Sequence, residues 1–156
     1  MSKIIAIIRE YRDRGFTLDA IKSIKEQTYK PDKIILVSNR DVSINGVEVV
    51  KYGEYFGEVL YNLSQEYPNS YFALLDDDDM WYPDHIQNFV DYMKKYNLWG
   101  RQSIFYISGN TRFFPSIDPG NMSSVIVSSD LNFKKIAKYE CCLLYTSDAA
   151  DERSSV

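Results

Sequence analysis

The sequence predicts one α/β domain in which helices cover both faces of a mostly parallel sheet. At 156 residues, 45% of them hydrophobic, the chain is long enough to form one sizeable core. Short runs rich in isoleucine, valine and leucine alternate with stretches in which apolar residues recur at helical spacing. Continuous apolar runs are typical of strands that are buried on both faces of a sheet. Together these observations indicate parallel strands connected by helices.

The first 37 residues predict a βαβ unit. Residues 3–8 form a first strand, and residues 17–30 form a helix that stops at Pro31. Residues 33–37 form a second buried strand. Since crossovers of this kind are right-handed and join parallel strands, the sheet is expected to be parallel here.

The rest of the chain continues the alternation of strands and helices. The Asn45-Gly46 pair is a turn signal before a third strand. Apolar residues at helical spacing predict a helix from residue 56 to near Pro68, and Pro83 marks the first turn of another. The other expected elements are strands at 47–51, 71–75, 103–108 and 125–127, a long loop at 109–122, and a last helix that begins at Ser129 and contains Leu131, Phe133 and Ile136.

Four consecutive carboxylates, Asp76 to Asp79, follow the buried strand at 71–75. On an extended backbone, alternate side chains share a side, so Asp76 and Asp78 are expected to face one way and Asp77 and Asp79 the other. Two carboxylates on one side can chelate Mg²⁺ or Mn²⁺, which prefer oxygen ligands. An acidic run is more often a solvated turn, but this one lies at the carboxyl end of a strand, where open α/β sheets bind ligands.

Charge and composition argue against several classes of partner. The formal net charge is −4 and no basic block occurs, so nucleic-acid binding is not expected. The first apolar run is too short for a signal peptide or a membrane span, which favours a cytoplasmic location and leaves peripheral membrane association open. The only cysteines, Cys141 and Cys142, are adjacent and unsuited to a disulfide framework or a zinc site. The only histidine, His85, is expected to be solvated and is left out of the site.

The acidic string and its surroundings resemble the nucleotide-sugar half of family 2 glycosyltransferases, which have the GT-A fold. The most specific match is Leu-Asp-Asp-Asp-Asp-Met-Trp-Tyr-Pro at residues 75–83. The segment 20–29, with its Ser-Ile and Gln-Thr-Tyr, is similar to the family's first helix, and residues 33–37 are similar to the strand that follows it. The resemblance covers roughly residues 3 to 140.

This resemblance implies roles for individual residues. Asp76 would contact the nucleotide and ribose, Asp78 would hold the metal that bridges the diphosphate, and Asp79 would support the site. The loop after the first strand carries Arg9-Glu10-Tyr11-Arg12 where the family usually has Pro-Thr-Tyr-Asn, and Ser38-Asn39 replaces an acidic pair, so the base of the donor is left open. The expected nucleotide-sugar site is Glu10, Tyr11, Asn39, Asp76 and Asp77, and the expected Mg²⁺ or Mn²⁺ ligands are Asp78 and Asp76.

The activity that the resemblance implies is metal-dependent transfer of a sugar from a nucleotide-diphosphate donor to an acceptor, with glycan, lipid and protein acceptors all left open. In the family, the general base lies in an acidic motif beyond the matching part, so no residue is nominated here. One alternative is a phosphohydrolase of the haloacid dehalogenase type, although its Asp motif normally follows the first strand rather than the fourth. Another is a non-catalytic domain that binds a metal or a nucleotide.

The end of the chain differs in character from the rest. Residues 142–156 show neither helical nor strand periodicity and resemble the translation of a sequencing adaptor. We therefore expect residues 1–141 to be a C-terminally truncated GT-A domain, inactive by itself, and residues 142–156 to be a disordered, non-native tail. Truncation would leave apolar surface exposed around Ile126, Phe133 and Ile136.

Overall fold

One six-stranded sheet forms the centre of the molecule in the computed structural model, which describes residues 2–106, 111–113, 122–131 and 133. The strands follow the order β3-β2-β1-β4-β8-β6. The first four of these run parallel to one another, whereas β8 is antiparallel to both of its neighbours. Their bounds are β1 (Lys3–Arg9), β2 (Lys33–Val37), β3 (Glu48–Val50), β4 (Ser70–Asp76), β6 (Ile104–Tyr106) and β8 (Val125–Ser128).

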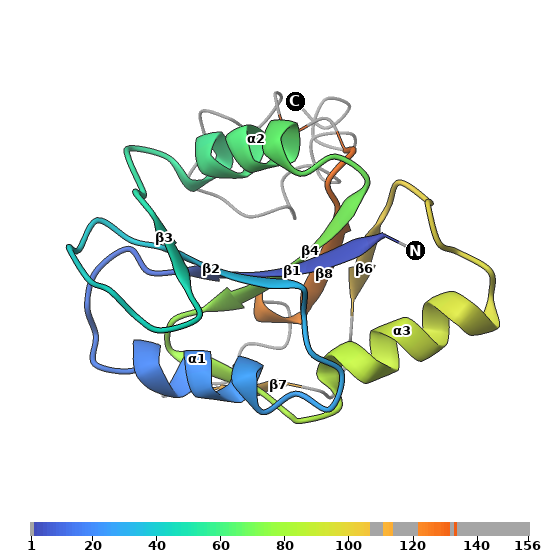
Figure 1. Cartoon of the computed structure of the whole chain (residues 1–156), viewed down its shortest axis with the longest axis horizontal. Helices are drawn as coiled ribbons and strands as arrows, with labels where there is room; N and C mark the ends of the chain where they lie inside the picture. Colours follow the sequence, from blue (N-terminus) through green and yellow to red (C-terminus); the bar gives the residue numbers. More distant parts are fainter. Residues whose placement is uncertain (1, 107–110, 114–121, 132, 134–156) are drawn as a thin grey trace, which may run out of the picture.

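Within the described residues, three α-helices cover the two faces of this sheet. They are α1 (Thr17–Lys25), α2 (Phe56–Glu66) and α3 (His85–Lys95). Figure 1 shows α2 on one face, with α1 and α3 together on the other. This arrangement confirms the predicted fold class, a mostly parallel sheet with helices on both faces. Among the described residues, none of the helices combines the length and the apolarity needed to cross a bilayer.

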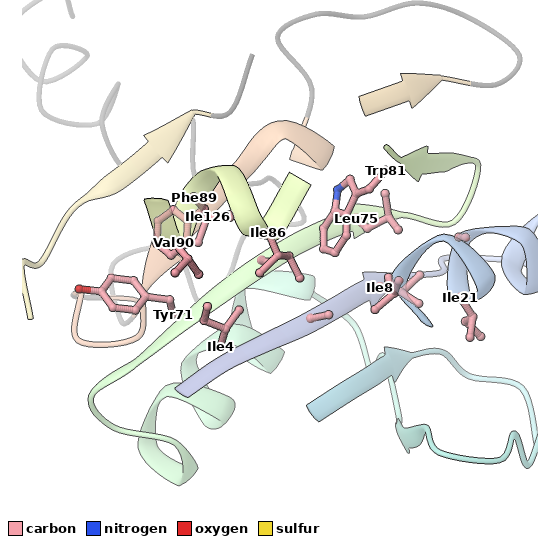
Figure 2. Packing of buried hydrophobic residues seen from close by; sticks show 14 of the residues in the cluster. Ile4, Ile8, Ile21, Tyr71, Leu75, Trp81, Ile86, Phe89, Val90 and Ile126 are labelled. Carbon is pink, nitrogen blue, oxygen red and sulfur yellow. The ribbon is translucent and has the colours of Figure 1, made fainter. Parts of the chain in front are cut away.

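Alternation along the strands divides the core into two layers. On one face, strand residues such as Ile5, Phe72 and Val127 pack with the apolar side of α2. On the other face, Tyr71 and its neighbours pack against α1 and α3. Figure 2 shows this second layer, in which the labelled side chains are Ile4, Ile8, Ile21, Tyr71, Leu75, Trp81, Ile86, Phe89, Val90 and Ile126. Strands covered on both sides must be apolar at every position, which explains their continuous apolar runs.

Strand register brings three chain segments to one edge of the sheet. Arg9, the last residue of β1, is level with Val37 on one side and Asp76 on the other. The backbone continues this pairing, because the Glu10 N–H donates to the carbonyl of Val37 and the Asp77 N–H donates to the carbonyl of Arg9. The segments that follow β1, β2 and β4 therefore meet at the carboxyl ends of parallel strands, where open α/β sheets bind ligands.

Part of the loop expected at 109–122 is instead a strand of a two-stranded ribbon. Within that range β7 (Thr111–Phe113) pairs antiparallel with β5 (Asp79–Trp81), so that Asp79 is level with Phe113. A short 3₁₀ helix, η1 (Met122–Ser124), leads directly into β8. The sequence did not predict β5 and β7, because three-residue strands are too short to show a period. Residues 114–121 lie outside the described residues.

Two expectations about exposure are wrong. Ile126 and Phe133 are fully buried, because Ile126 lies in the middle of the sheet and the Phe133 ring packs 6.2 Å from the ring of Phe72. His85 is also fully buried, with its ring stacked on the indole of Trp81 at 4.4 Å. Ile136, most of the expected last helix and residues 142–156 lie outside the described residues.

Candidate functional site

The carboxylates after β4 converge at the edge of the sheet. Oxygen atoms of Asp76, Asp78 and Asp79 all lie within 4.8 Å of one another. Asp76 ends β4, residues 77–78 form a turn, and Asp79 begins β5. The expected pairing of Asp77 with Asp79 on the opposite side is therefore wrong, because the turn ends the extended alternation after Asp76. Asp76 and Asp78 do lie together, as their spacing predicted.

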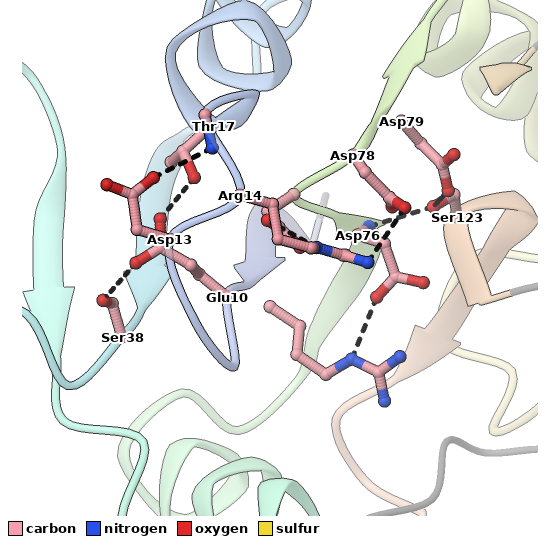
Figure 3. Close-up of polar contacts among 12 residues, drawn as sticks. Glu10, Asp13, Arg14, Thr17, Ser38, Asp76, Asp78, Asp79 and Ser123 are labelled. Carbon is pink, nitrogen blue, oxygen red and sulfur yellow. Dashed lines mark hydrogen bonds and ion pairs between the residues drawn. The ribbon is translucent and has the colours of Figure 1, made fainter. Parts of the chain in front are cut away.

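Ser123, on η1, fixes the shape of this group. Its hydroxyl accepts a hydrogen bond from the Asp76 N–H at 2.9 Å and donates one to the Asp79 carboxylate, beside which it lies in Figure 3. The indole of Trp81 donates to the Ser123 carbonyl at 2.8 Å. Sequence reasoning missed Ser123, because a single serine more than forty residues from the acidic string carries no local signal.

Two arginines lie against the carboxylates. Arg9 Nε is 2.9 Å from Asp76 Oδ1. Arg14 Nη1 is 3.1 Å from Asp78 Oδ2, as Figure 3 shows. Arg14 also donates through Nε and Nη2 to both oxygens of Asp77, which is almost fully buried. Burial raises the pKa values of Asp76 and Asp78 in spite of these arginines. The folded chain therefore disfavours the charge on both carboxylates, and a bound cation would relieve that cost.

A hollow of about 400 Å³ opens beside the carboxylates, and its lining is mostly cationic. It is lined by Arg9, Tyr11, Arg12, Arg14 and Asp77. A larger hollow, of about 490 Å³, lies near Lys3 and Ser70, at the amino ends of β1 and β4. We place the functional site at the smaller hollow, because it borders the acidic group and the carboxyl ends of the parallel strands.

Glu10 is fully buried behind this hollow and is saturated with hydrogen bonds. Oε1 accepts from Ser38 at 2.5 Å and from Arg40 Nε at 2.7 Å, while Oε2 accepts from Thr17 and from Arg40 Nη2 at 2.7 Å. Burial alone would raise the pKa of Glu10, but the hydrogen bonds from Arg40, Ser38 and Thr17 outweigh it and lower the pKa to about 2. Both oxygens are already engaged, which favours a positioning role for Glu10 over direct contact with a nucleotide.

Tyr11 and Asn39 lie at the same edge of the sheet as Asp76, as predicted, but they are placed differently. Tyr11 lines the hollow, is 69% exposed and packs edge-on against Tyr52, with the ring centroids 5.5 Å apart. Asn39 is also exposed but does not line the hollow. Its side-chain Oδ1 accepts from the backbone N–H groups of Tyr52 and Gly53 and so holds the segment after β3.

Comparison with solved structures finds proteins of similar fold. The fold is similar to that of S. aureus TarS 1-349 in complex with UDP-GlcNAc, with a TM-score of 0.59 and 12% identity over 88% of this chain and 48% of that one. The two proteins share a fold. The chain is equally similar, with a TM-score of 0.59 and 12% identity, to 4-diphosphocytidyl-2C-methyl-D-erythritol synthase, over 100% of this chain and 87% of that one. These likenesses confirm the predicted class of nucleotide-sugar transferase fold.

A search by sequence finds a relative that is described as a glycosyltransferase. The chain is 24% identical over 174 residues to an uncharacterized glycosyltransferase of Rickettsia typhi (strain ATCC VR-144 / Wilmington). The match covers 91% of this chain but only 55% of the relative, so the chain spans about half of that protein's length. No family model matches the sequence. The comparisons do not favour the phosphohydrolase alternative.

Proposed function

We propose that this chain is the donor-binding part of a metal-dependent glycosyltransferase of family 2. The observation that carries the proposal is the group formed by Asp76, Asp78 and Asp79 beside the arginine-lined hollow. This group lies at the carboxyl ends of β1 and β4. The strand order reverses there, because β2 and β3 lie on one side of β1 whereas β8 and β6 lie on the other side of β4. Open α/β sheets bind ligands at such a switch point. The likeness to the Rickettsia glycosyltransferase and to TarS with UDP-GlcNAc supports this function over a purely structural role.

The residues of the acidic group fit a hard divalent cation. Three carboxylate oxygens within 4.8 Å of one another are a donor set that suits Mg²⁺ or Mn²⁺ better than a softer metal. Asp78 and Asp76 would hold the ion, with Asp79 held nearby by Ser123. A bound ion would supply stabilisation of the negative charge that develops on the leaving diphosphate.

The remaining residues of the site would bind and orient the nucleotide. The exposed ring of Tyr11 offers an aromatic face at the mouth of the hollow. Because Oδ1 of Asn39 already accepts two backbone hydrogen bonds, its amide N–H groups are the atoms that would contact a base. Asp77 lines the hollow but is held by Arg14, so its contact with the donor would pass through that guanidinium.

Calorimetry with a panel of nucleotides tests this function. UDP, GDP, dTDP and CDP are titrated into the chain with Mn²⁺ and then with EDTA. We expect one of them to bind in Mn²⁺ and to bind at least about tenfold more weakly in EDTA, because the ion bridges carboxylates and phosphates. The corresponding nucleoside, which has no phosphates, is the control and should bind weakly in both conditions. Failure of every diphosphate to bind would contradict the proposed function.

We further propose that residues 1–141 contain everything needed for donor binding but not for sugar transfer. The general base implied by the family resemblance lies beyond the matching residues, and loss of general-base catalysis costs roughly 10²–10⁴-fold in rate. Deleting residues 142–156 should leave the melting temperature and the nucleotide affinity unchanged, as measured by scanning calorimetry and titration. Rapid sugar transfer by the chain, or a marked loss of stability on deletion, would contradict this division.

A further inference from the structure

Arg14 contacts two carboxylates, Asp77 and Asp78, through different nitrogen atoms of its guanidinium group. Its Nε and Nη2 donate to the two oxygens of Asp77, which fixes the plane of the guanidinium. Its Nη1 reaches Asp78 at 3.1 Å, and Asp78 belongs to the acidic group that would hold a metal. Arg14 thus partly neutralises a candidate metal ligand while Asp77 holds it in place.

The loop that carries Arg14 is closed at its base. Glu10 begins it and Thr17 ends it, and the Thr17 hydroxyl donates to the Glu10 carboxylate, as Figure 3 shows. Between them Arg12 and Arg14 both line the hollow. Gly15, whose φ is +87°, follows Arg14, and its N–H donates to the Asp13 side chain at 3.0 Å. A pinned loop presents its guanidinium groups to a ligand at a smaller entropic cost than a free one.

The charges around the hollow suit the binding of a divalent cation together with an anion. Arg9, Arg12 and Arg14 line the hollow beside the four carboxylates of residues 76 to 79, so the three positive charges leave one negative charge in excess. A divalent ion would reverse this sign and favour an anion such as a diphosphate. Arg12 is exposed, and within the described part of the chain none of the ion pairs involves it.

We propose that Arg12 and Arg14 bind the phosphate groups of the ligand directly, and that Arg14 does so by exchanging Asp78 for a phosphate oxygen when a divalent cation binds Asp78. Asp77 keeps its two hydrogen bonds to Arg14 throughout and acts as a positioning residue. This inference rests on the proposed function, because it assigns the phosphate contacts of the same site. Under this proposal, binding of the cation to Asp78 is coupled to release of Arg14 Nη1 from Asp78.

Arg14→Lys provides the main test. Lysine keeps the positive charge near Asp77, but its compact ammonium cannot hold both Asp77 and Asp78 as the guanidinium fork does. Binding of Mn²⁺ alone, measured by electron paramagnetic resonance, should become about three- to tenfold tighter, because Asp78 no longer has to give up an ion pair. Binding of pyrophosphate in the presence of saturating Mn²⁺, measured by calorimetry, should become at least about threefold weaker, because the ammonium cannot replace the released Nη1 group. A variant that had merely lost structure would weaken both.

Two further variants test whether Arg14 competes with the cation for Asp78 or acts only through its positive charge. Arg12→Gln removes a positive charge from the hollow without touching a carboxylate, so it should weaken pyrophosphate binding and change Mn²⁺ affinity by less than about twofold. Arg101→Gln, an exposed arginine beyond the amino end of β4, should change neither. Equal melting temperatures would verify that all three variants are folded.

Either of two results would overturn the inference: unchanged or weaker Mn²⁺ binding in Arg14→Lys, or unchanged pyrophosphate binding in both Arg12→Gln and Arg14→Lys. These outcomes are distinct from failure of the proposed function. If the nucleotide panel shows no binding but the Mn²⁺ and pyrophosphate results hold, the site binds phosphate and metal without serving a nucleotide sugar.

Discussion

Asp78→Asn is expected to abolish the metal dependence of nucleotide-diphosphate binding. The substitution removes one charged oxygen ligand from a group of three whose oxygens lie within 4.8 Å of one another. Because Mg²⁺ and Mn²⁺ are held mainly by one or two carboxylates and by substrate phosphates, the metal-dependent part of the affinity should fall by about 10- to 100-fold. Titration of the diphosphate with Mn²⁺ and with EDTA should then give nearly equal dissociation constants.

Asp91→Asn is the matched control. Asp91 is exposed on α3, a different element from those that carry the acidic group, and it accepts a hydrogen bond from Gln87. This variant should keep the full response to EDTA. A normal response to EDTA in Asp78→Asn would show that Asp78 is not a metal ligand.

The same variant has a second expected effect, on metal-free stability. Burial raises the pKa of Asp78 above its unfolded value, so the ionised form costs stability at neutral pH and that cost diminishes as the pH falls through the raised pKa. Asparagine removes the cost but also weakens the contact with Arg14. We expect a net gain of about 0.5 kcal/mol in the free energy of unfolding without metal. A lower melting temperature in EDTA would contradict this expectation.

Glu10→Gln should cause the largest loss of stability. The pKa of Glu10 is lowered from 4.5 to about 2, which corresponds to about 3 kcal/mol of stability in the ionised form. Glutamine has nearly the same shape but no charge, so Arg40 would keep only its ion pair with the exposed Asp13, at 3.5 Å, and Ser38 and Thr17 would have one acceptor oxygen between them. Urea denaturation at pH 7 should show a loss approaching this value.

The pH dependence gives an independent check on Glu10. Because its folded pKa is depressed, its contribution is fully present above about pH 4.5 and is lost as the pH falls toward 2. The stability of Glu10→Gln should therefore decline less steeply than that of the original chain across this window. Glu58→Gln, an exposed change on α2, should alter stability by less than about 0.5 kcal/mol and keep the original pH profile. A loss below 0.5 kcal/mol for Glu10→Gln would refute the role of this cluster.

Much of the fold could be predicted because its signals are local. Residues 33–37 were expected as a strand and form β2 with the same bounds, since a continuous apolar run has few alternatives once it must be buried on both faces. The helix expected from residue 56 begins at Phe56 for a similar reason, because its apolar spacing matches one face packed on the sheet. Three-residue strands such as β5 and β7 have no such signal and depend on pairing with each other.

The sequence alone determined that four carboxylates would stand at the carboxyl end of a buried strand, together with the segment after β1. Only the tertiary structure decided how they divide: Asp79 joins Asp76 and Asp78 through Ser123, whereas Asp77 is held by Arg14. It also decided that Glu10 is buried against Arg40 instead of facing the hollow. These partners are between 30 and 63 positions apart in the chain. Their contacts arise from strand order and register, which position side chains without leaving a local pattern in the sequence.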